Sequence, residues 1–444
     1  MRSKLWKGFS LVALFIATLL ISSFVMPSKH TAAGGNGFGM DYIAFYRAGT
    51  LVHTGHADRL YDLQDTIDFD RDIARRLNLS AASVFGPFLN PPFFAWIFAP
   101  LATLNYGQSL FAWVALNICC FAGAAALLCR IIPQEYDLDP NQDPLRDWRN
   151  VALVPALMVV SLPFIQTIGH AQDTFISLLL MSWAVVCWRE RRAVSAGIAA
   201  GLLFYKPQLA AVVILPMVFT LGWHALAGAC ISIESLILLN TASLPGTLTK
   251  YRLALAPNVQ YTLAFHPYLW QRHATFNGFW HGVLGMVSPA AASSFASYIA
   301  IFCSIPIVIG LIVCVWRNRK NGSRDRLIAA VIAAAPLIMP YYLDYDLLLL
   351  SIPAVLLAAE MIDRGPAQTM PRKDAWLIRL WVGLFLLLLI NPGLTSVLHV
   401  NLSVPLLAAI AGLSIARAAR ADESQISDIN SFNSQSAQLW QSAA

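Results

Sequence analysis

The sequence predicts an all-α membrane protein whose chain crosses the lipid bilayer many times. Of its 444 residues, 57% are hydrophobic and only 12% are charged, and the mean hydropathy is +0.60. Soluble domains carry about 25% charged residues, so this chain has roughly half of the usual charged surface. Apolar stretches close to the roughly 20 residues that a spanning helix needs recur along the chain. The fold class is therefore a polytopic helical membrane protein.

Twelve apolar segments are expected to be transmembrane helices. In chain order they are 7–26, 107–130, 150–168, 171–188, 193–205, 207–222, 224–243, 288–316, 327–340, 346–360, 377–398 and 402–418. A further stretch, 92–104 (PFFAWIFAPLATL), is too short to cross and is expected to form a re-entrant or interfacial helix. The first segment could pass for a signal peptide, but the many later spans favour an uncleaved helix.

The distribution of basic residues predicts which side of the membrane each loop faces. With the N-terminus inside, 20 of the 30 lysine and arginine residues fall in inner segments, as the positive-inside rule favours. These residues are Arg2, Lys4, Lys7, Arg130, Arg146, Arg149, Arg189, Arg191, Arg192, Arg317, Arg319, Lys320, Arg324, Arg326, Arg364, Arg372, Lys373, Arg379, Arg417 and Arg420. This orientation puts two long loops, 27–91 and 244–287, outside and both termini in the cytoplasm. The polar segment 421–444 is expected to be a disordered cytoplasmic tail.

The sequence also excludes several kinds of function. Nothing in it resembles a metal site, a P-loop or a dinucleotide-binding fold, so no cofactor and no metal are expected. The seven cysteines lie in or beside apolar segments without metal-binding spacing, and helix packing is expected of them. The net charge of +6 reflects topology and lipid contact rather than binding of nucleic acid. No soluble domain is present, so the function resides in the membrane and the outer loops.

The first outer loop places a carboxylate soon after the first predicted span, in the stretch GMDYIAFYRAG (39–49). Tyr42 and Tyr46 are four residues apart and share one face of a predicted helix. Asp41 and Arg47 are about 240° apart around that helix, so they are not expected to pair. Two interpretations of Asp41 remain open. It either caps this helix or is a functional carboxylate near the bilayer surface.

Lys206 lies between two apolar runs, where an unpaired ammonium group is costly. Pro207 breaks the helix there, which is typical of backbone that lines a cavity. Lys206 is therefore expected to bind an anionic group, and the alternative is a lysine that extends to the outer headgroups. Arg47, Arg252 and Arg272 are further candidates for the same role.

The second outer loop combines three histidines, His266, His273 and His281, with the aromatic residues Trp270 and Trp280. Its aromatic rings could stack on a sugar, and a histidine could bind phosphate or assist a base. The alternative is an aromatic belt at the membrane interface, which needs no ligand.

Two further carboxylates, Asp344 and Asp346, lie near the outer end of a predicted span. They could bind hydroxyl groups of a substrate. Alternatively, they cap the helix that is expected to begin near Leu347.

The order of these motifs resembles glycosyltransferase family 87, whose members are polyprenol-phosphate-mannose-dependent membrane transferases. The resemblance is carried by Asp41 with YRAG (46–49), LVHTGHADRLYDLQ (51–64), FLNPPFFAWIFAPLATL (88–104), GHAQDTFISLLL (169–180), GIAAGLLFYKPQLA (197–210) and PYYLDYDLLLL (340–350). The chain departs from the family in one motif. It has Gly169-His170-Ala171-Gln172-Asp173 where Gly-Gln-x-Asn is more usual.

The resemblance implies a GT-C type fold with about 12 transmembrane helices in a single domain, 1–420. It implies transfer of a hexose, expected to be mannose, from a polyprenyl phosphate carrier to a lipid or glycan acceptor. The expected place is a bacterial inner membrane, with the active site on the outer, periplasmic face. The expected partners are this donor, this acceptor and membrane lipids.

The chemistry of that reaction requires one base and a cationic site. Asp41 matches the family's catalytic aspartate in the first outer loop and is expected to accept the proton of the acceptor hydroxyl. The residues expected to bind the donor phosphate or sugar are Lys206, Arg47, Tyr46, His273, His281 and Gln172. Asp344 and Asp346 are expected to bind the acceptor.

Two other classes of function remain open from the sequence. One is a transporter or flippase of a lipid-linked or anionic substrate, whose activity would survive loss of Asp41. The chain lacks duplicated halves, which disfavours a transporter built from repeats. The other is a membrane scaffold without catalysis, whose outer loops would tolerate substitution.

Overall fold

The structure is a computed structural model that describes residues 38–39, 41–76, 86–132, 144–264, 268–319, 323–364 and 371–420. Within these residues the regular structure is helical, and one isolated antiparallel bridge joins His273 to Leu343. The first expected span, 7–26, and the expected tail, 421–444, lie outside the described residues.

Helices occupy the remaining expected spans. They are α4 (Tyr106–Cys129), α5 (Pro144–Val159), α6 (Leu162–His170), α7 (Thr174–Arg189), α8 (Ala193–Leu202), α9 (Pro207–Leu221), α10 (Trp223–Ser243), α13 (Pro289–Asn318), α14 (Arg324–Ile338), the short helix η8 (Asp344–Leu350) with α15 (Ser351–Arg364), α16 (Arg372–Leu398) and α17 (Ser403–Ala418). In the described part of the chain, five are long and apolar enough to cross a membrane, namely α4, α10, α13, η8 with α15, and α16. The bent pair α5 and α6 would make a sixth, and α7, α8, α9 and α17 are shorter apolar helices.

The expectation of one continuous helix over 150–168 was wrong. The chain bends by 61° between α5 and α6. Ser161 leaves the helical conformation, and its side chain accepts a hydrogen bond from the backbone of Phe164 at 3.4 Å. Pro163 follows in the first turn of α6, where its missing N–H costs nothing. A capped start with proline favours a new helix over continuation of the old one.

The stretch 92–104 also differs from the single helix expected there. It forms two short 3-10 helices, η3 (Pro92–Ile97) and η4 (Leu101–Thr103). Prolines at 91, 92 and 100 remove backbone donors and restrict the preceding residues, so the segment cannot form one α-helix. The segment still packs on its neighbours, since Trp96 donates from Nε1 to the Ser243 hydroxyl at 2.9 Å.

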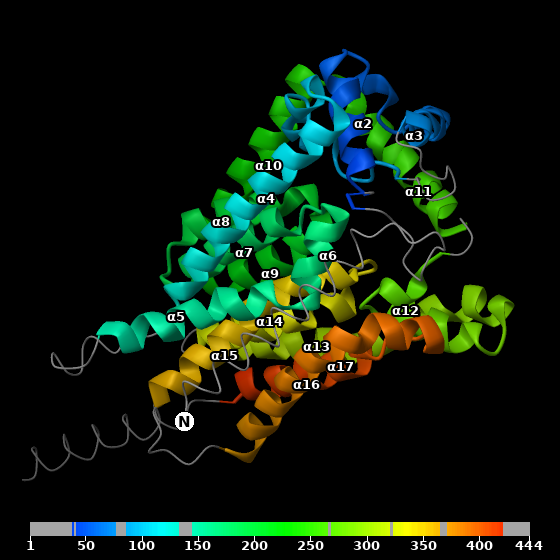
Figure 1. Ribbon diagram of the computed structural model, residues 1–444. Coiled ribbons are helices and arrows are strands. Elements are labelled where there is room, and N and C mark those ends of the chain that lie inside the picture. Colours follow the sequence, from blue (N-terminus) through cyan, green and yellow to red (C-terminus); the bar gives the residue numbers. More distant parts are fainter. Residues whose placement is uncertain are drawn as a thin grey trace, which may run out of the picture.

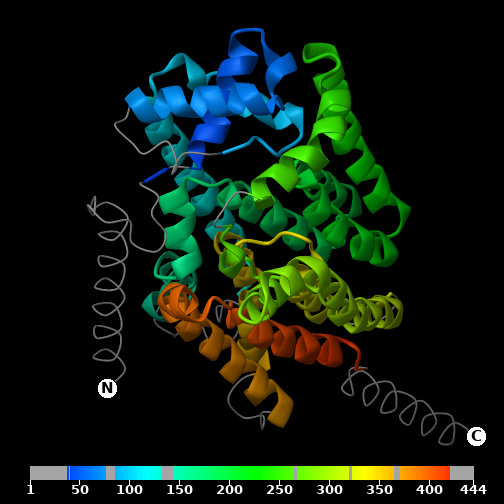
Figure 2. The ribbon, with the colours of Figure 1, turned by 90° about the vertical axis from the view of Figure 1, so that its right-hand side faces the viewer.

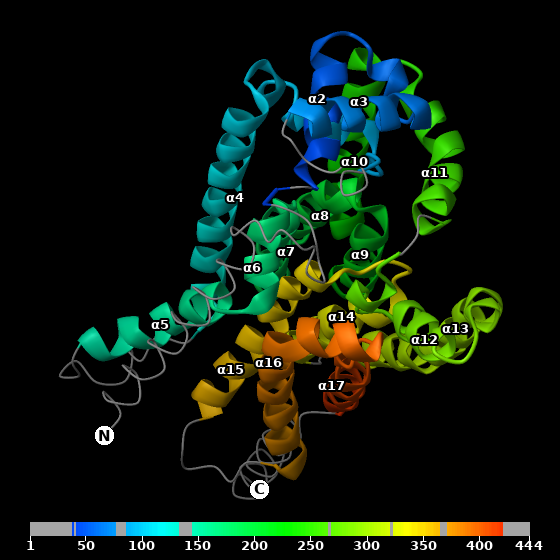
Figure 3. The same ribbon diagram turned by 45° about the vertical axis from the view of Figure 1, so that its right-hand side comes forward.

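The first outer loop folds into a helical layer at one end of the molecule. It contains α2 (Tyr42–His53), η1 (Ala57–Arg59) and α3 (Leu63–Arg76). Figures 1 and 3 show this layer beside the upper ends of α4 and α10, and Figure 2 shows the C-terminal helices at the opposite end. The ring of Phe45 in α2 stacks on Phe98 with 4.7 Å between centroids, and both pack against the buried Trp113 of α4. These aromatic contacts fix α2 on the membrane helices.

The second outer loop is also largely helical, with α11 (Thr247–Ala264), η7 (Trp270–Arg272) and α12 (Phe276–Gly285). It contacts the first outer loop directly. The amide of Asn258 donates to the Tyr61 carbonyl at 3.0 Å, and Lys250 Nζ donates to the Asp58 carbonyl at 3.0 Å. The two loops that the basic residues assigned to one side therefore lie on one side of the molecule.

Candidate active site

Backbone contacts bring the start of the first outer loop against the end of α6. The amide of Gly39 donates to the carbonyl of Gly169 at 2.8 Å, and the Tyr106 hydroxyl donates to the carbonyl of Gly39 at 2.9 Å. Gly39 has φ of +72°, a conformation that glycine adopts without steric cost. Asp41 follows two residues later and is thereby placed beside His170, the last residue of α6.

Asp41 occupies the N-cap position of α2, but its side chain makes no capping hydrogen bond. The carboxylate instead contacts the turn after α6. Gln172 donates from Nε2 to Asp41 Oδ2 at 2.8 Å, and His170 Nδ1 lies 3.4 Å from the same oxygen. No described residue donates a hydrogen bond to Oδ1, and the side chain is 28% exposed. The capping interpretation of Asp41 is therefore wrong, because its carboxylate faces the turn after α6 rather than the start of α2.

The charges around Asp41 keep its carboxylate ionised. Burial alone would raise the pKa of Asp41 above its ordinary value of 3.8. The interactions with His170, the charge of Arg272 and the hydrogen bond from Gln172 outweigh this effect and lower the pKa of Asp41 to about 2. At neutral pH the group is a carboxylate and can accept a proton.

Arg272 forms the second charged pair of the site. Its Nε and Nη2 donate to the two oxygens of Asp344 at 3.0 and 2.9 Å, a bidentate arrangement that fixes the guanidinium plane. Gln166 donates to Asp344 Oδ2 at 2.8 Å, and the guanidinium lies 5.8 Å from the ring centroid of Tyr345. Burial alone would lower the pKa of Arg272, but the charges of Asp344 and Asp41 raise it. The second outer loop therefore contributes a permanent cation close to Asp41.

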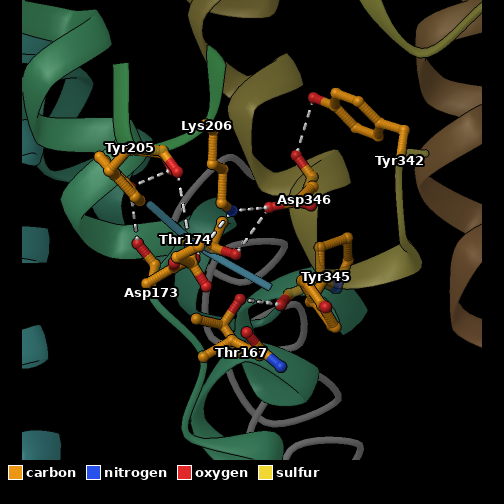
Figure 4. A network of polar contacts seen from close by, with 12 residues as sticks. Thr167, Asp173, Thr174, Tyr205, Lys206, Tyr342, Tyr345 and Asp346 are labelled. Carbon is orange, nitrogen blue, oxygen red and sulfur yellow. Dashed lines mark hydrogen bonds and ion pairs between the residues drawn. The ribbon is translucent and has the colours of Figure 1, made fainter. Parts of the chain in front are cut away.

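Lys206 forms the third charged group (Figure 4). It lies at the junction of the short helix η6 (Leu203–Tyr205) and α9. Its ammonium nitrogen lies 2.8 Å from Asp173 Oδ1 and 2.9 Å from Asp346 Oδ1, and Thr174 donates to the same oxygen of Asp346 at 3.0 Å. The lysine side chain is only 19% exposed. Lys206 is thus paired twice inside the protein and does not extend to the lipid headgroups.

The two described histidines of the second outer loop lie close to Arg272. His273 is 1% exposed, and its Nε2 lies 2.7 Å from the hydroxyl of Tyr268. Burial lowers the pKa of His273 to about 4, so this imidazole is neutral at neutral pH. His281 stacks on Trp270 with 3.7 Å between centroids. The third histidine of the loop, residue 266, lies outside the described residues.

Short contacts connect this loop to the chain before η8 and to the chain between α16 and α17. The amide of Ala274 donates to the carbonyl of Tyr342 at 2.8 Å, and Asn401 Nδ2 donates to the carbonyl of His273 at 3.2 Å. Asp344 begins η8 two residues after Tyr342, and Asp346 follows in the same turn. The two carboxylates accept hydrogen bonds from the Arg272 and Lys206 side chains, so they hold the cations of the site.

Two residues expected in the donor site lie apart from the Asp41 group. The hydroxyl of Tyr46 donates to the carbonyl of Leu104 at 2.9 Å. Arg47 is 1% exposed, and its Nη2 donates to the carbonyl of Leu60 at 2.7 Å. These contacts stabilise the first outer loop itself.

Sequence reasoning gave no role to three residues that complete the site. They are His170 beside Asp41, Gln166 on Asp344, and Asp173 on Lys206. The sequence could have shown that Gln166 and His170 belong together, because they are four residues apart and share a face of α6. Asp173 is the last residue of the GHAQD motif, whose departure from the family pattern was visible in the sequence.

The fold and this site define a polytopic helical membrane protein with carboxylates, arginine and lysine gathered beneath two packed loops. The model of glycosyltransferase family 87 matches residues 88–340, which is more than half of the chain. The protein belongs to glycosyltransferase family 87 and is a membrane glycosyltransferase. No curated protein and no solved structure matches the chain. The family match includes His170, Lys206 and Arg272, whereas Asp41 precedes it and Asp344 follows it.

Proposed function

We propose that this glycosyltransferase moves a hexose, most simply mannose, from a polyprenyl phosphate carrier to a lipid or glycan acceptor. The proposal includes a GT-C type fold and a site on the outer face of a bacterial inner membrane. Asp41 is the general base. One observation carries this assignment: the carboxylate has one oxygen bound by Gln172 and beside His170, and a second oxygen without a donor among the described residues.

The proposed reaction uses this geometry. The acceptor hydroxyl gives its proton to Asp41 Oδ1 while its oxygen attacks the anomeric carbon of the sugar. The bond from that carbon to the phosphate oxygen breaks, and the polyprenyl phosphate leaves with the electron pair. The family resemblance implies inversion, in which the attack comes from the side opposite the phosphate and a β-linked donor gives an α-linked product. The leaving phosphate is a stable anion and needs a cation rather than a protonating acid.

Arg272 is the better placed of the two paired cations to stabilise the phosphate. Lys206 is shared by two carboxylates, whereas Arg272 has the single partner Asp344 and acts on Asp41 through its charge. A phosphate oxygen that replaced Asp344 would meet the same flat pair of N–H donors. Lys206, in the neighbouring group with Asp173 and Asp346, adds a second positive charge that stabilises the phosphate. In this arrangement Asp344 and Asp346 hold the cations in place before the donor binds.

The decisive experiment replaces Asp41 by asparagine in the purified full-length protein. Asp41→Asn keeps the size of the side chain and removes the proton acceptor. Turnover with a polyprenyl phosphate sugar donor and a lipid extract as acceptor should fall by about 10²–10⁴-fold, while donor binding is retained. Asp58→Asn, on an exposed carboxylate of the same loop, is the matched control and should transfer like the parent.

Parental turnover in Asp41→Asn would overturn the assignment of the base. Movement of lipid-linked sugar across vesicles without formation of a glycosidic bond would favour the transporter interpretation instead. Mass spectrometry of the glycolipids from a deletion strain and its parent would identify the acceptor and the sugar.

A further inference from the structure

Helix α10 carries an acidic side chain in the middle of a candidate membrane span. Glu234 is the twelfth of the 21 residues of α10, so it lies roughly 16 Å from the start of a helix about 30 Å long. The side chain is exposed, and no described residue forms a hydrogen bond or an ion pair with it. A carboxyl group without a partner is costly at the centre of a bilayer. Its presence there indicates a contact that the described chain does not supply.

The other described helices of spanning length keep their charged side chains near the ends. Helix α4 has none, and α13 has only Arg317, the residue before its last. In η8 with α15, the charged residues lie in the first three and the last five positions, and in α16 they lie in the first eight. Among the charged residues of these five spans, Glu234 lies farthest from a helix end.

The residues around Glu234 form a surface that suits a second helix. Ser235 is exposed beside it, and Ile231 and Leu238 are 54% and 68% exposed. These four residues, the Glu234 stripe, have the i, i+3, i+4 and i+7 spacing of one helix face. The opposite face of α10 is already occupied, because Gly228 packs closely against α8. The stripe is therefore the face of α10 on which another helix can pack.

We propose that the Glu234 stripe is the contact surface between two copies of this protein in the membrane. A two-fold axis along the membrane normal places the same residue of both copies at the same depth. The Glu234 carboxyl group of each copy then meets the Ser235 hydroxyl of the other, and Ile231 and Leu238 pack on either side of these contacts.

The surface is complementary to itself because a carboxyl group and a hydroxyl group lie next to each other on it. The Ser235 hydroxyl donates to the Ile231 carbonyl of its own helix at 2.6 Å, which leaves its oxygen able to accept a hydrogen bond. It suits Glu234 in either protonation state, since it can accept from a carboxylic acid or rotate and donate to a carboxylate. Hydrogen bonds and close packing drive association between membrane helices, because lipid is as apolar as their surfaces. This contact takes no part in the proposed reaction.

Energy transfer between dye-labelled copies of the purified full-length protein in phosphatidylcholine vesicles measures the association. The parent should associate as the ratio of protein to lipid rises. Glu234→Leu should weaken this association by about 5–30-fold, the usual effect of hydrogen bonds between membrane helices, with turnover unchanged. Glu234→Gln keeps a donor and an acceptor and should still associate. Cys119→Leu, on an exposed position of α4, is the control and should associate like the parent.

A mixed pair of variants tests whether the two residues meet across the contact. Two Glu234→Leu copies, or two Ser235→Ala copies, retain neither contact between residues 234 and 235. A Glu234→Leu copy paired with a Ser235→Ala copy retains one of them, from the glutamate of the second copy to the serine of the first. The mixed pair should therefore associate about twofold to fivefold more tightly than either pair of identical variants.

Four results would overturn the inference. They are a parent that is monomeric at every ratio, parental association in Glu234→Leu, loss of association in Glu234→Gln, and a mixed pair no tighter than the identical pairs. The first needs no variant, so the test does not depend on the folding of any substitution. A monomeric parent whose unfolding temperature falls in Glu234→Leu would assign the stripe to another part of this chain, such as the expected span 7–26. Failure of the proposed function has a different signature, since Asp41→Asn would then transfer at the parental rate.

Discussion

Gly39 shows how one residue outside the reaction can control where the base lies. Its φ of +72° and the three hydrogen bonds of its backbone, with Gly169, Tyr42 and Tyr106, determine how the chain enters α2. A Cβ at this position would meet the side chain of Leu110 at 2.7 Å. Alanine would therefore be strained twice, by its backbone conformation and by this contact.

Gly39→Ala should lower turnover by about 10–100-fold through displacement of Asp41, because small misplacements of a reacting group are costly. Gly55→Ala is the matched control. Gly55 has the similar φ of +78°, but a Cβ there meets nothing within 4 Å. Gly55→Ala should lose about 1 kcal/mol of stability and Gly39→Ala more than that, and only Gly39→Ala should lose activity. Equal turnover in the two variants, measured with thermal unfolding, would contradict the positioning role.

Lys206 illustrates the difference between a buried cation that binds substrate and one that neutralises its neighbours. Lys206→Ala would leave Asp173 and Asp346 facing each other without a counter-ion. Removal of one partner from a buried ion pair typically costs about 3–5 kcal/mol, so we expect a large drop in the unfolding temperature. Lys206→Arg retains the charge and should keep most of the stability.

A combined variant separates the two roles of Lys206. The triple substitution Lys206→Met, Asp173→Asn and Asp346→Asn removes the whole charged group and should recover stability relative to Lys206→Ala. If the ammonium also stabilises the departing phosphate, turnover of the triple variant stays low. Recovery of turnover together with stability would show that Lys206 acts only by neutralising the two carboxylates.

At the scale of the helices, close packing decides where the site can form. The helices α8 and α10 approach so closely that a Cβ on Gly197 would lie 2.0 Å from the carbonyl oxygen of Ala225. Small residues permit such contact between membrane helices. The chain continues from α8 through η6 to Lys206, so this contact also sets the depth of the lysine.

Gly197→Ala should therefore destabilise the protein, because backbone atoms of α10 cannot move aside cheaply. Gly393→Ala in α16 is the control, since a Cβ there meets nothing within 4 Å. On helix propensity alone, the control should gain about 0.5–1 kcal/mol. Unfolding temperatures in detergent test both variants. A stabilising effect of Gly197→Ala would refute the close approach of the two helices.

At the scale of the whole molecule, the charged residues divide between two ends. Lys250 contacts Asp58 in the layer of the two outer loops. A separate group joins the ends of α7 and α14, where Arg189 makes two hydrogen bonds to Asp325 at 2.7 and 2.8 Å. A second ion-pair group, with Glu360 between Arg326 and Arg417, connects α14, α15 and α17. These contacts join residues that the sequence assigns to the same side, and the side of the membrane that each end faces stays a prediction.

Reporter fusions can assign a side of the membrane to each end. Fusions after Asp58 and Arg252 should report the outside, and fusions after Glu190 and Arg319 the cytoplasm, because the positive-inside rule retains arginine-rich segments there. A cytoplasmic signal after Asp58 would place Asp41 opposite the proposed donor and would refute the outer-face site. Opposite signals at Asp58 and Arg252 would contradict the packing of the two loops.

The sequence by itself determined the class of fold, most of the helix positions and the candidate residues Asp41, Gln172 and Lys206. A long apolar run can satisfy its backbone hydrogen bonds in a bilayer only as a helix, so the hydrophobicity of the sequence predicts these helices. The bend between α5 and α6 was missed because the apolar run is continuous there. Hydropathy does not register the capping of Ser161 or the restriction imposed by Pro163.

Only the tertiary structure decided which polar residues meet. Asp41 and Gln172 are 131 residues apart in the chain, and Lys206 and Asp346 are 140 apart. A buried charge requires a partner of opposite charge, and the sequence could predict that Lys206 has one. It could not name that partner, because the choice depends on how the helices pack. The same packing took Arg47 into the first outer loop and brought Arg272 close to Asp41.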